Sequence, residues 1–156
     1  MSIVDANPTV NWDALTDEAV RHLYALLRFD TTNPPGNELA AAMYIRDQLA
    51  VEGIESQIVE PAQGRGNIWA RLAGNGQHRP LMLLSHLDVV PVERDKWSID
   101  PFGGEINDGF VYGRGAVDMK QIAAIELTLL LHFARQQRDT GEQLGRDLIL
   151  LAVADE

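Results

Sequence analysis

Two short segments place side chains that can bind a metal ion directly after apolar stretches of the chain. In Leu84-Ser85-His86-Leu87-Asp88 the histidine and the aspartate are two residues apart, so they point to the same side of an extended chain. A metal-bound imidazole usually donates its second N–H to a carboxylate, which fixes its tautomer. The spacing therefore fits a metal ligand, His86, that is oriented by Asp88. Taken alone, the pair is more simply a strand-end histidine hydrogen-bonded to a surface aspartate.

The second segment is a glycine-flanked turn, residues 112–120, which brings Asp118 to the start of a predicted helix. In isolation, Asp118 is most simply a helix N-cap. Gly113 and Gly115 also resemble the opening of a nucleotide-binding loop. However, Asp118 stands where that loop has its third glycine, and its carboxylate would repel a pyrophosphate. A nucleotide-binding domain is therefore disfavoured.

A third acidic segment, residues 154–156 (Ala-Asp-Glu), follows the last apolar run and by itself is ordinary solvated charge. The remaining histidines, His22, His78 and His132, fall in predicted helices or a polar loop, and we expect all three to be non-catalytic. The sequence has no cysteine and no Gly-x-Ser-x-Gly elbow, so these covalent hydrolase mechanisms lack a nucleophile. Any zinc site must use histidine and carboxylate ligands.

Helices that alternate with apolar strands predict a layered α/β fold that brings these segments together. Apolar periodicity predicts three helices. The first is N-capped by Thr16 and has an apolar face made of Val20, Leu23, Tyr24 and Leu27. The second covers 38–52 with Ala42, Ile45 and Leu49 on one face, and the third covers 119–138 with an inner face made of Ile122, Ile125, Leu129 and Phe133. Apolar runs predict strands over 54–60, 67–72, 81–84 and 148–154, and a hairpin around 107–109.

The apolar run Leu81–Leu84 is typical of a strand that is covered on both faces in a mainly parallel sheet. In open α/β sheets the ligand crevice lies beyond the carboxyl ends of the strands. We therefore expect His86 and Asp118 to converge at that edge of the sheet.

The composition is that of one globular domain: 156 residues, of which 46% are hydrophobic and 23% charged. The net charge of -10 argues against nucleic acid or an anionic membrane as a partner. We find no signal peptide and no run of 18 apolar residues, and so expect a cytoplasmic protein.

The segments SHLDVVP, Trp97 with Asp100-Pro101-Phe102, GRGAVDMK and ADE, taken in this order and spacing, are similar to one known family. They resemble the catalytic half of the two-zinc amidohydrolases and exopeptidases, a family that includes acetylornithine deacetylase, succinyl-diaminopimelate desuccinylase, aminoacylase and carboxypeptidase G. The resemblance covers nearly all of the chain. It implies a three-layer α/β domain with a mixed, mainly parallel sheet flanked by helices.

By this resemblance His86 would bind one zinc ion, Asp118 would bridge two, Asp88 would support His86, and Glu156 would be the general base. Co²⁺ or Mn²⁺ could replace Zn²⁺. The implied reaction is hydrolysis of an amide bond in a small N-acyl amino acid or peptide.

The family's pattern continues with a second glutamate, a zinc ligand, directly after the base. Its other ligands and, in many members, a smaller dimerisation domain also come later, and the complete protein could then be a homodimer. We therefore expect residues 1–156 to be the N-terminal portion of a zinc peptidase-like catalytic domain and to be inactive alone. The alternative is an inactive homologue or a fragment that acts as a binding module.

Overall fold

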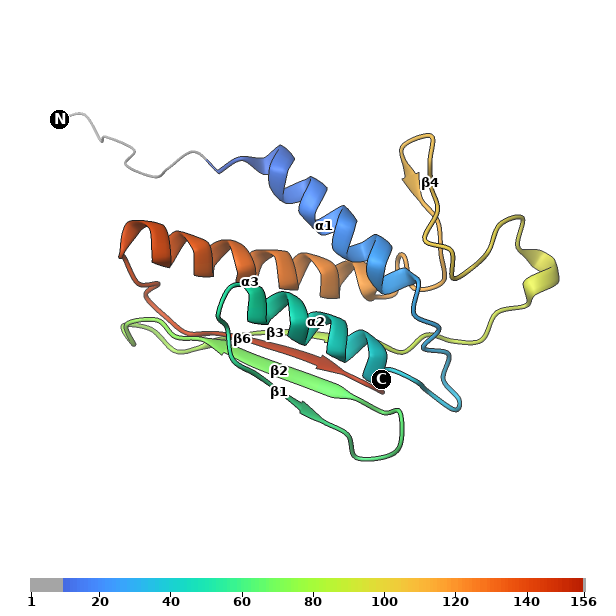
Figure 1. Ribbon diagram of the computed structural model, residues 1–156, viewed down its shortest axis with the longest axis horizontal. Coiled ribbons are helices and arrows are strands. Elements are labelled where there is room, and N and C mark those ends of the chain that lie inside the picture. Colours follow the sequence, from blue (N-terminus) through green and yellow to red (C-terminus); the bar gives the residue numbers. More distant parts are fainter. Residues whose placement is uncertain (1–9, 156) are drawn as a thin grey trace.

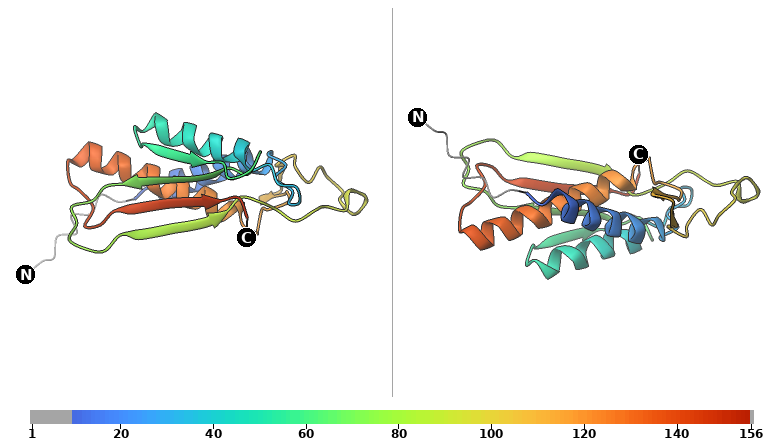
Figure 2. Two further views of the ribbon diagram at one scale, coloured as in Figure 1. Left: turned by 90° about the horizontal axis from the view of Figure 1, so that it is seen from below. Right: turned by 90° about the horizontal axis from the view of Figure 1, so that it is seen from above.

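The computed structural model describes residues 10–155, which form an α/β structure with the helices on one face of a sheet (Figures 1 and 2). The three α-helices of this part of the chain are α1 (Trp12–Leu27), α2 (Leu39–Val51) and α3 (Lys120–Thr140). Helix α2 packs on the β1 and β2 side of the sheet, α3 packs on β3 and β6, and α1 packs on α3. None of these helices is long and apolar enough to cross a membrane.

The main sheet has the strand order β1-β2-β6-β3 in the described residues. Its strands are β1 (Ser56–Val59), β2 (Asn67–Leu72), β3 (Leu81–His86) and β6 (Leu148–Val153). Strand β6 is parallel to β3, because α3 carries the chain back along the sheet between the two strands. The β1/β2 and β2/β6 pairs are antiparallel, so the prediction of a mainly parallel sheet is wrong for this part of the fold, which is mixed.

The first helix begins earlier than its periodicity predicts. Its N-cap is Asn11, whose Oδ1 accepts a hydrogen bond from the Ala14 N–H at 3.1 Å. Thr16 is not the cap, because it lies inside the helix and its hydroxyl donates to the Trp12 carbonyl at 2.8 Å. Leu23 is buried as predicted, whereas Tyr24 is 38% exposed, because α1 contacts the rest of the molecule mainly along α3.

Helix α2 buries the three residues predicted for its inner face, Ala42, Ile45 and Leu49. The predicted inner face of α3 is only partly correct: Phe133 packs against the core, and Ile122 and Leu129 are half-buried. Ile125 is 45% exposed, and the buried apolar residues are Ala123, Ala124, Leu127, Leu130, Leu131 and Ala134. The true stripe lies one to two positions further along the chain, because α3 must contact both α1 and the sheet.

One face of the sheet is not covered by any described element, which contradicts the prediction that strand 81–84 is buried on both faces. Met82 and Leu84 of β3 are 52% and 53% exposed, and Leu84 is in register with Leu151 and, across β6, with Trp69. We call this surface the outer face: Trp69, Met82, Leu84, Ile149 and Leu151. Residues 10–155 thus place helices against one face only, and not on both as a three-layer arrangement requires.

A long connection between β3 and α3 contains a short 3₁₀-helix, Arg94–Lys96, and the predicted hairpin. The hairpin pairs β4 (Ile106–Asn107) with β5 (Phe110–Val111). Asp108 and Gly109 both have positive φ, 51° and 80°, as a two-residue hairpin turn requires. The prediction of a hairpin at this position is confirmed.

Candidate metal centre

His86 is the last residue of β3 and is held between two carboxylates. Its Nε2 lies 3.3 Å from Asp118 Oδ1, and its Nδ1 lies 3.2 Å from Asp88 Oδ1. The predicted convergence of His86 and Asp118 at the carboxyl edge of the sheet is confirmed as a matter of geometry. The position predicted for Asp88, within hydrogen-bonding distance of the other ring nitrogen, is also confirmed as geometry.

Asp118 belongs to the tight turn that precedes α3. The turn packs closely on residues just after β3: a Cβ on Gly115, whose φ is 90°, would lie only 2.8 Å from Val89 Cγ1. The N-cap of α3 is Met119, and no side chain makes a capping hydrogen bond there. The Asp118 carboxylate is 80% exposed. It is therefore not an N-cap, and the simplest structural explanation for this residue does not hold.

Lys120, the first residue of α3, connects this turn to the C-terminal end of α1 through hydrogen bonds. Its side chain is fully buried, and Nζ donates to the carbonyls of Leu26 at 3.1 Å and Phe29 at 2.8 Å. Burial lowers the pKa of Lys120 to about 8. Our sequence reasoning missed this residue, although a lysine at the start of an apolar helix and next to a candidate ligand was a usable signal.

A cavity of about 220 Å³ opens where these segments meet. It is lined by His86, by residues 88–90 and by residues 113–118. The candidate ligands therefore border a space in which a small group can bind.

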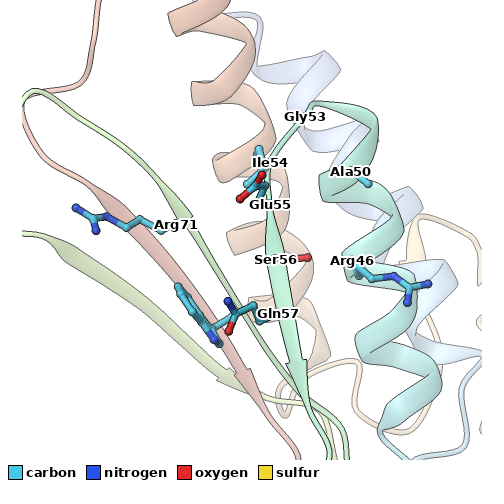
Figure 3. Close-up of a pocket in the computed structure, with 9 residues that line it drawn as sticks. Arg46, Ala50, Gly53, Ile54, Glu55, Ser56, Gln57 and Arg71 are labelled. Atoms are coloured by element: carbon cyan, nitrogen blue, oxygen red, sulfur yellow. The ribbon is translucent and has the colours of Figure 1, made fainter.

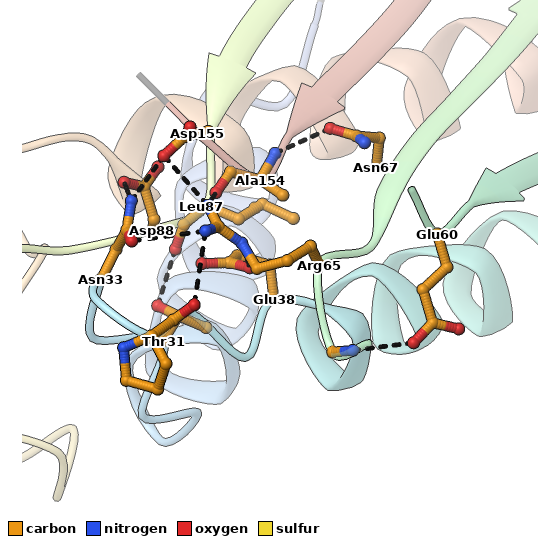
Figure 4. A network of polar contacts seen from close by, with 12 residues as sticks. Thr31, Asn33, Glu38, Glu60, Arg65, Asn67, Leu87, Asp88, Ala154 and Asp155 are labelled. Atoms are coloured by element: carbon orange, nitrogen blue, oxygen red, sulfur yellow. Dashed lines mark hydrogen bonds and ion pairs between the residues drawn. The ribbon is translucent and has the colours of Figure 1, made fainter. Parts of the chain in front are cut away.

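Asp88 also contacts a second polar cluster (Figure 4). Its Oδ2 accepts a hydrogen bond from Asn33 Nδ2 at 3.1 Å, and the same Nδ2 lies 2.5 Å from Asp155 Oδ1. Arg65 donates to Asp155 at 3.0 Å, and this hydrogen bond holds the pKa of Asp155 below its usual value. We did not predict a role for Asn33 or Arg65, because their partners are distant in sequence. Glu156, the predicted general base, lies outside the described residues.

A larger hollow of about 580 Å³ lies between α2 and the edge strand β1 (Figure 3). Two arginines border it, and both have acidic partners: Arg46 contacts Asp47 at 2.7 Å and Arg71 contacts Asp147 at 2.5 Å. It contains no histidine among its lining residues. Despite its smaller size, we take the cavity at His86 as the candidate site, because the titratable groups converge there.

The donor set at His86 fits a zinc ion in chemical type but is incomplete. An imidazole nitrogen and a carboxylate oxygen face one another, and a second carboxylate on Nδ1 can fix the tautomer. Within residues 10–155, no group of three or more histidine, cysteine or acidic side chains is arranged to hold a metal ion. His22 is not part of the site, since it is buried against the Tyr44 hydroxyl at 2.7 Å.

A histidine and an aspartate that meet beyond the carboxyl end of a strand in an α/β fold lie where a ligand crevice is expected and are of the residue types that bind zinc. Residues 82–156 match the model of the Peptidase family M20/M25/M40. The chain belongs to this family.

Two similar curated proteins are a succinyl-diaminopimelate desuccinylase of Wolinella succinogenes and aminoacylase-1 of Sus scrofa. The first is 38% identical over 108 residues, which is 69% of this chain and 28% of that protein. The second is 33% identical over 132 residues, which is 83% of this chain and 31% of that protein. The chain thus spans about a third of the length of the curated relatives it matches.

Two solved structures show the same fold. An M20 family metallo-carboxypeptidase from Sulfolobus solfataricus matches with a TM-score of 0.74 and 25% identity, over 90% of this chain and 31% of that one. A Bacillus subtilis protein, described as a dinuclear metal-binding peptidase of the M20 family, matches with a TM-score of 0.58 and 16% identity, over 92% of this chain and 36% of that one. Dinuclear metal binding is therefore a property found within this family.

Proposed function

We propose that this chain supplies part of the two-zinc centre of a hydrolase that cleaves the amide bonds of N-acyl amino acids or small peptides. The observation that carries the proposal is the arrangement around His86, with Asp118 at Nε2 and Asp88 at Nδ1. The names of the relatives, a desuccinylase, an aminoacylase and a carboxypeptidase, support this substrate class.

His86 and Asp118 would hold the metal ions, with Asp118 as the bridging carboxylate. Zinc ions supply Lewis acidity, which polarises a carbonyl group and lowers the pKa of water. Asp88 would accept the Nδ1–H of His86 through its carboxylate at 3.2 Å and its backbone carbonyl at 3.1 Å, which leaves Nε2, the nitrogen that faces Asp118, as the metal ligand. Because His86 is buried and the Asp118 carboxylate is exposed, the imidazole is fixed while the carboxylate remains open to the cavity.

We assign the general-base role to Glu156, as the family resemblance implies. A base of this kind takes a proton from the attacking water and later delivers it to the departing amine. Its carboxylate must lie near the reacting carbonyl without serving as a metal ligand. Asp155, its neighbour in the chain, is hydrogen-bonded to Asn33, which also contacts Asp88.

The test measures zinc content and amide hydrolysis together. The 156-residue chain and the protein extended through its natural reading frame are loaded with zinc and analysed for bound metal. Release of free amine is then measured on N-succinyl and N-acetyl amino acids and on dipeptides. We expect the extended protein to bind two zinc ions and to hydrolyse at least one of these classes.

The matched variants are His86→Ala and His132→Ala, because His132 lies on α3 away from the cavity. We expect the first to lose bound zinc and activity and the second to retain both. Full activity in His86→Ala, or an extended protein that binds no zinc, would contradict the proposal and favour a metal-free binding module.

A further inference from the structure

Arg65 joins three segments of the chain through one guanidinium group: its own connection, the loop before α2 and the residues just after β6 (Figure 4). It lies in the connection between β1 and β2, and its side chain is 19% exposed. Nε donates to Glu38 Oε2 at 2.8 Å, and Nη1 donates to Asn33 Oδ1 at 3.3 Å. Nη2 donates to the Ala154 carbonyl and to Asp155 Oδ1, the latter at 3.0 Å. One side chain thus fixes the chain just after β6 against the loop before α2.

The loop is folded tightly around this guanidinium. Gly36 has a φ of 87°, and a Cβ there would lie 2.4 Å from Arg65 Nε. Glu38 has no exposed surface, and its burial raises the pKa of its carboxyl group. Such a buried pair is a weak source of stability, but its planar, multi-donor geometry defines directions that a lysine ammonium cannot reproduce.

Asn33 connects this cluster to the candidate metal centre. Its side-chain nitrogen donates to Asp88 Oδ2 and to Asp155 Oδ1, and its side-chain oxygen accepts from Arg65. The position of Asp155 is therefore tied to the carboxylate that orients His86. Asn33 therefore contacts both Asp88, which orients His86, and Asp155, which precedes the predicted general base Glu156.

We propose that Arg65, acting with Asn33, is a positioning residue that holds the segment after β6 at the metal centre and thereby places Glu156 for proton transfer. This role rests on the proposed function. Arg65 is not catalytic itself, because its hydrogen bonds go to the side chains of Glu38, Asn33 and Asp155 and to the carbonyls of Pro35 and Ala154, and not to His86 or Asp118.

The chain offers a matched control, an arginine–aspartate pair at the opposite end of β6. Arg71 of β2 pairs with Asp147, the residue before β6, just as Arg65 pairs with Asp155, which follows β6. Arg71 is far from the His86 cavity in the register of the sheet, since it lies opposite Ile149. The loss of an arginine–aspartate pair at one end of β6 can thus be compared with the same loss at the other end.

The first measurement is hydrogen exchange of single amides in the wild type, Arg65→Lys and Arg71→Lys. We expect Arg65→Lys to speed the exchange of the Ala154 amide, which donates to Asn67 Oδ1 at 2.8 Å, by about tenfold or more. Arg71→Lys should leave that amide unchanged and affect only the region around Asp147. Equal protection of Ala154 in the two variants would overturn the proposal, whatever the protein catalyses.

The second measurement is steady-state kinetics of the zinc-loaded, extended protein. We expect Arg65→Lys to lower kcat by about 10 to 100-fold with little change in KM or zinc affinity, because the base is displaced while the ligands stay in place. Asn33→Ala should lower kcat in the same way. Arg71→Lys should retain the kcat of the wild type.

Together, the two measurements distinguish a failure of the positioning role of Arg65 from a failure of the proposed hydrolase function. Faster exchange at Ala154 with an unchanged kcat would show that Arg65 is only structural. A parallel loss of zinc would assign Arg65 to the metal site itself and also refute a positioning role. A wild-type protein without zinc or activity would refute the proposed function, whereas the exchange data would still decide whether Arg65 fixes the end of β6.

Discussion

His86 has a carboxylate at each ring nitrogen, but the two carboxylates differ in exposure. Asp88 is buried and shares its second oxygen with Asn33, whereas the Asp118 side chain is 80% exposed. A buried carboxylate with fixed partners is suited to orient an imidazole, and an exposed one is suited to bind an incoming cation. The two aspartates therefore have different roles, although both contact the same side chain.

We expect Asp88→Ala to weaken zinc binding or turnover by about 10 to 100-fold, because His86 Nδ1 then loses its carboxylate partner and keeps only the backbone carbonyl of residue 88, at 3.1 Å. Zinc competition titrations and amine-release assays on the extended protein measure the effect. Asp95→Ala, in the exposed 3₁₀-helix, serves as the control and should match the wild type. Unchanged affinity and turnover in Asp88→Ala would refute the supporting role.

His22 makes the stability of the fold depend on pH. Burial lowers the pKa of its imidazole below 6.5, partly offset by Glu18, and Arg21 and Arg135 act in the same direction as burial. As the pH falls below 6.5, the unfolded chain binds a proton at His22 that the folded chain does not. The free energy of unfolding should therefore decrease in this window, by at most about 1.4 kcal/mol per pH unit.

Urea denaturation between pH 7 and pH 5 tests this expectation. His22→Gln should be less stable than the wild type at pH 7 but should show a smaller loss on acidification, since glutamine does not titrate. His78→Gln, in an exposed loop, should retain the full dependence. If His22→Gln loses stability on acidification as steeply as the wild type, another group controls the effect.

At the scale of single residues, local sequence motifs predicted the geometry of His86, Asp88 and Asp118, because each residue lies at or just after the end of a strand or in a glycine-containing turn. Arg65 and Asn33 could not be predicted in this way. Their contacts join residues 27 to 122 positions apart in sequence, and only the packed fold brings them together.

At the scale of elements, Arg135 joins all three helices of the described chain. From α3 it donates to both Glu18 oxygens of α1 at 2.7 and 2.8 Å, and to Glu52 at the end of α2 at 2.7 Å. Its hydrogen bond lowers the pKa of Glu18, and the same type of bond lowers the pKa of Glu52. Both carboxylates are largely buried, so they need this cation.

We expect Arg135→Ala to lower the free energy of unfolding by roughly 2–4 kcal/mol, because it leaves two largely buried carboxylates without their main partner. Arg138→Ala removes a more exposed arginine from Glu52 and should cost much less. Chemical denaturation of both variants at neutral pH gives the comparison. Equal losses would mean that burial of the network does not matter.

The buried faces of the helices and the pairing of the strands were predicted with mixed success. The inner face of α2 was predicted correctly, although apolar residues such as Met43 and Val51 are exposed on its other side. In α3, apolar residues lie on several faces, and the sequence alone could not show that Ala123 and Leu127 face inward while Ile125 is exposed. The antiparallel β2/β6 pairing also depends on long-range topology, which periodicity does not encode.

At the scale of the whole molecule, the outer face leaves a continuous apolar surface open. Met82 and Leu84 are more than half exposed, and β3 is at an edge of the sheet, so its backbone can pair with another strand. We expect the 156-residue chain to self-associate as its concentration rises. Sedimentation velocity over a concentration series measures this association.

The double variant Met82→Lys, Leu84→Lys should reduce the association, because it places two charges on the exposed edge strand of the outer face. Val51→Lys adds a charge at an exposed position on α2 and should not. A wild-type chain that stays monomeric at every concentration would contradict the prediction.

The position of β6 has a consequence for how the chain folds as it is synthesised. This strand lies between β2 and β3, yet its residues follow those of all the other described elements. At 5–20 residues per second, the ribosome needs roughly 3 to 12 s to proceed from the end of β3 to the start of β6. Until then β2 and β3 have no strand between them, and their apolar edges are exposed to other chains and to chaperones. The sheet, and with it the contacts of Asn33 and Arg65 with Asp155, therefore forms only as the last described strand arrives.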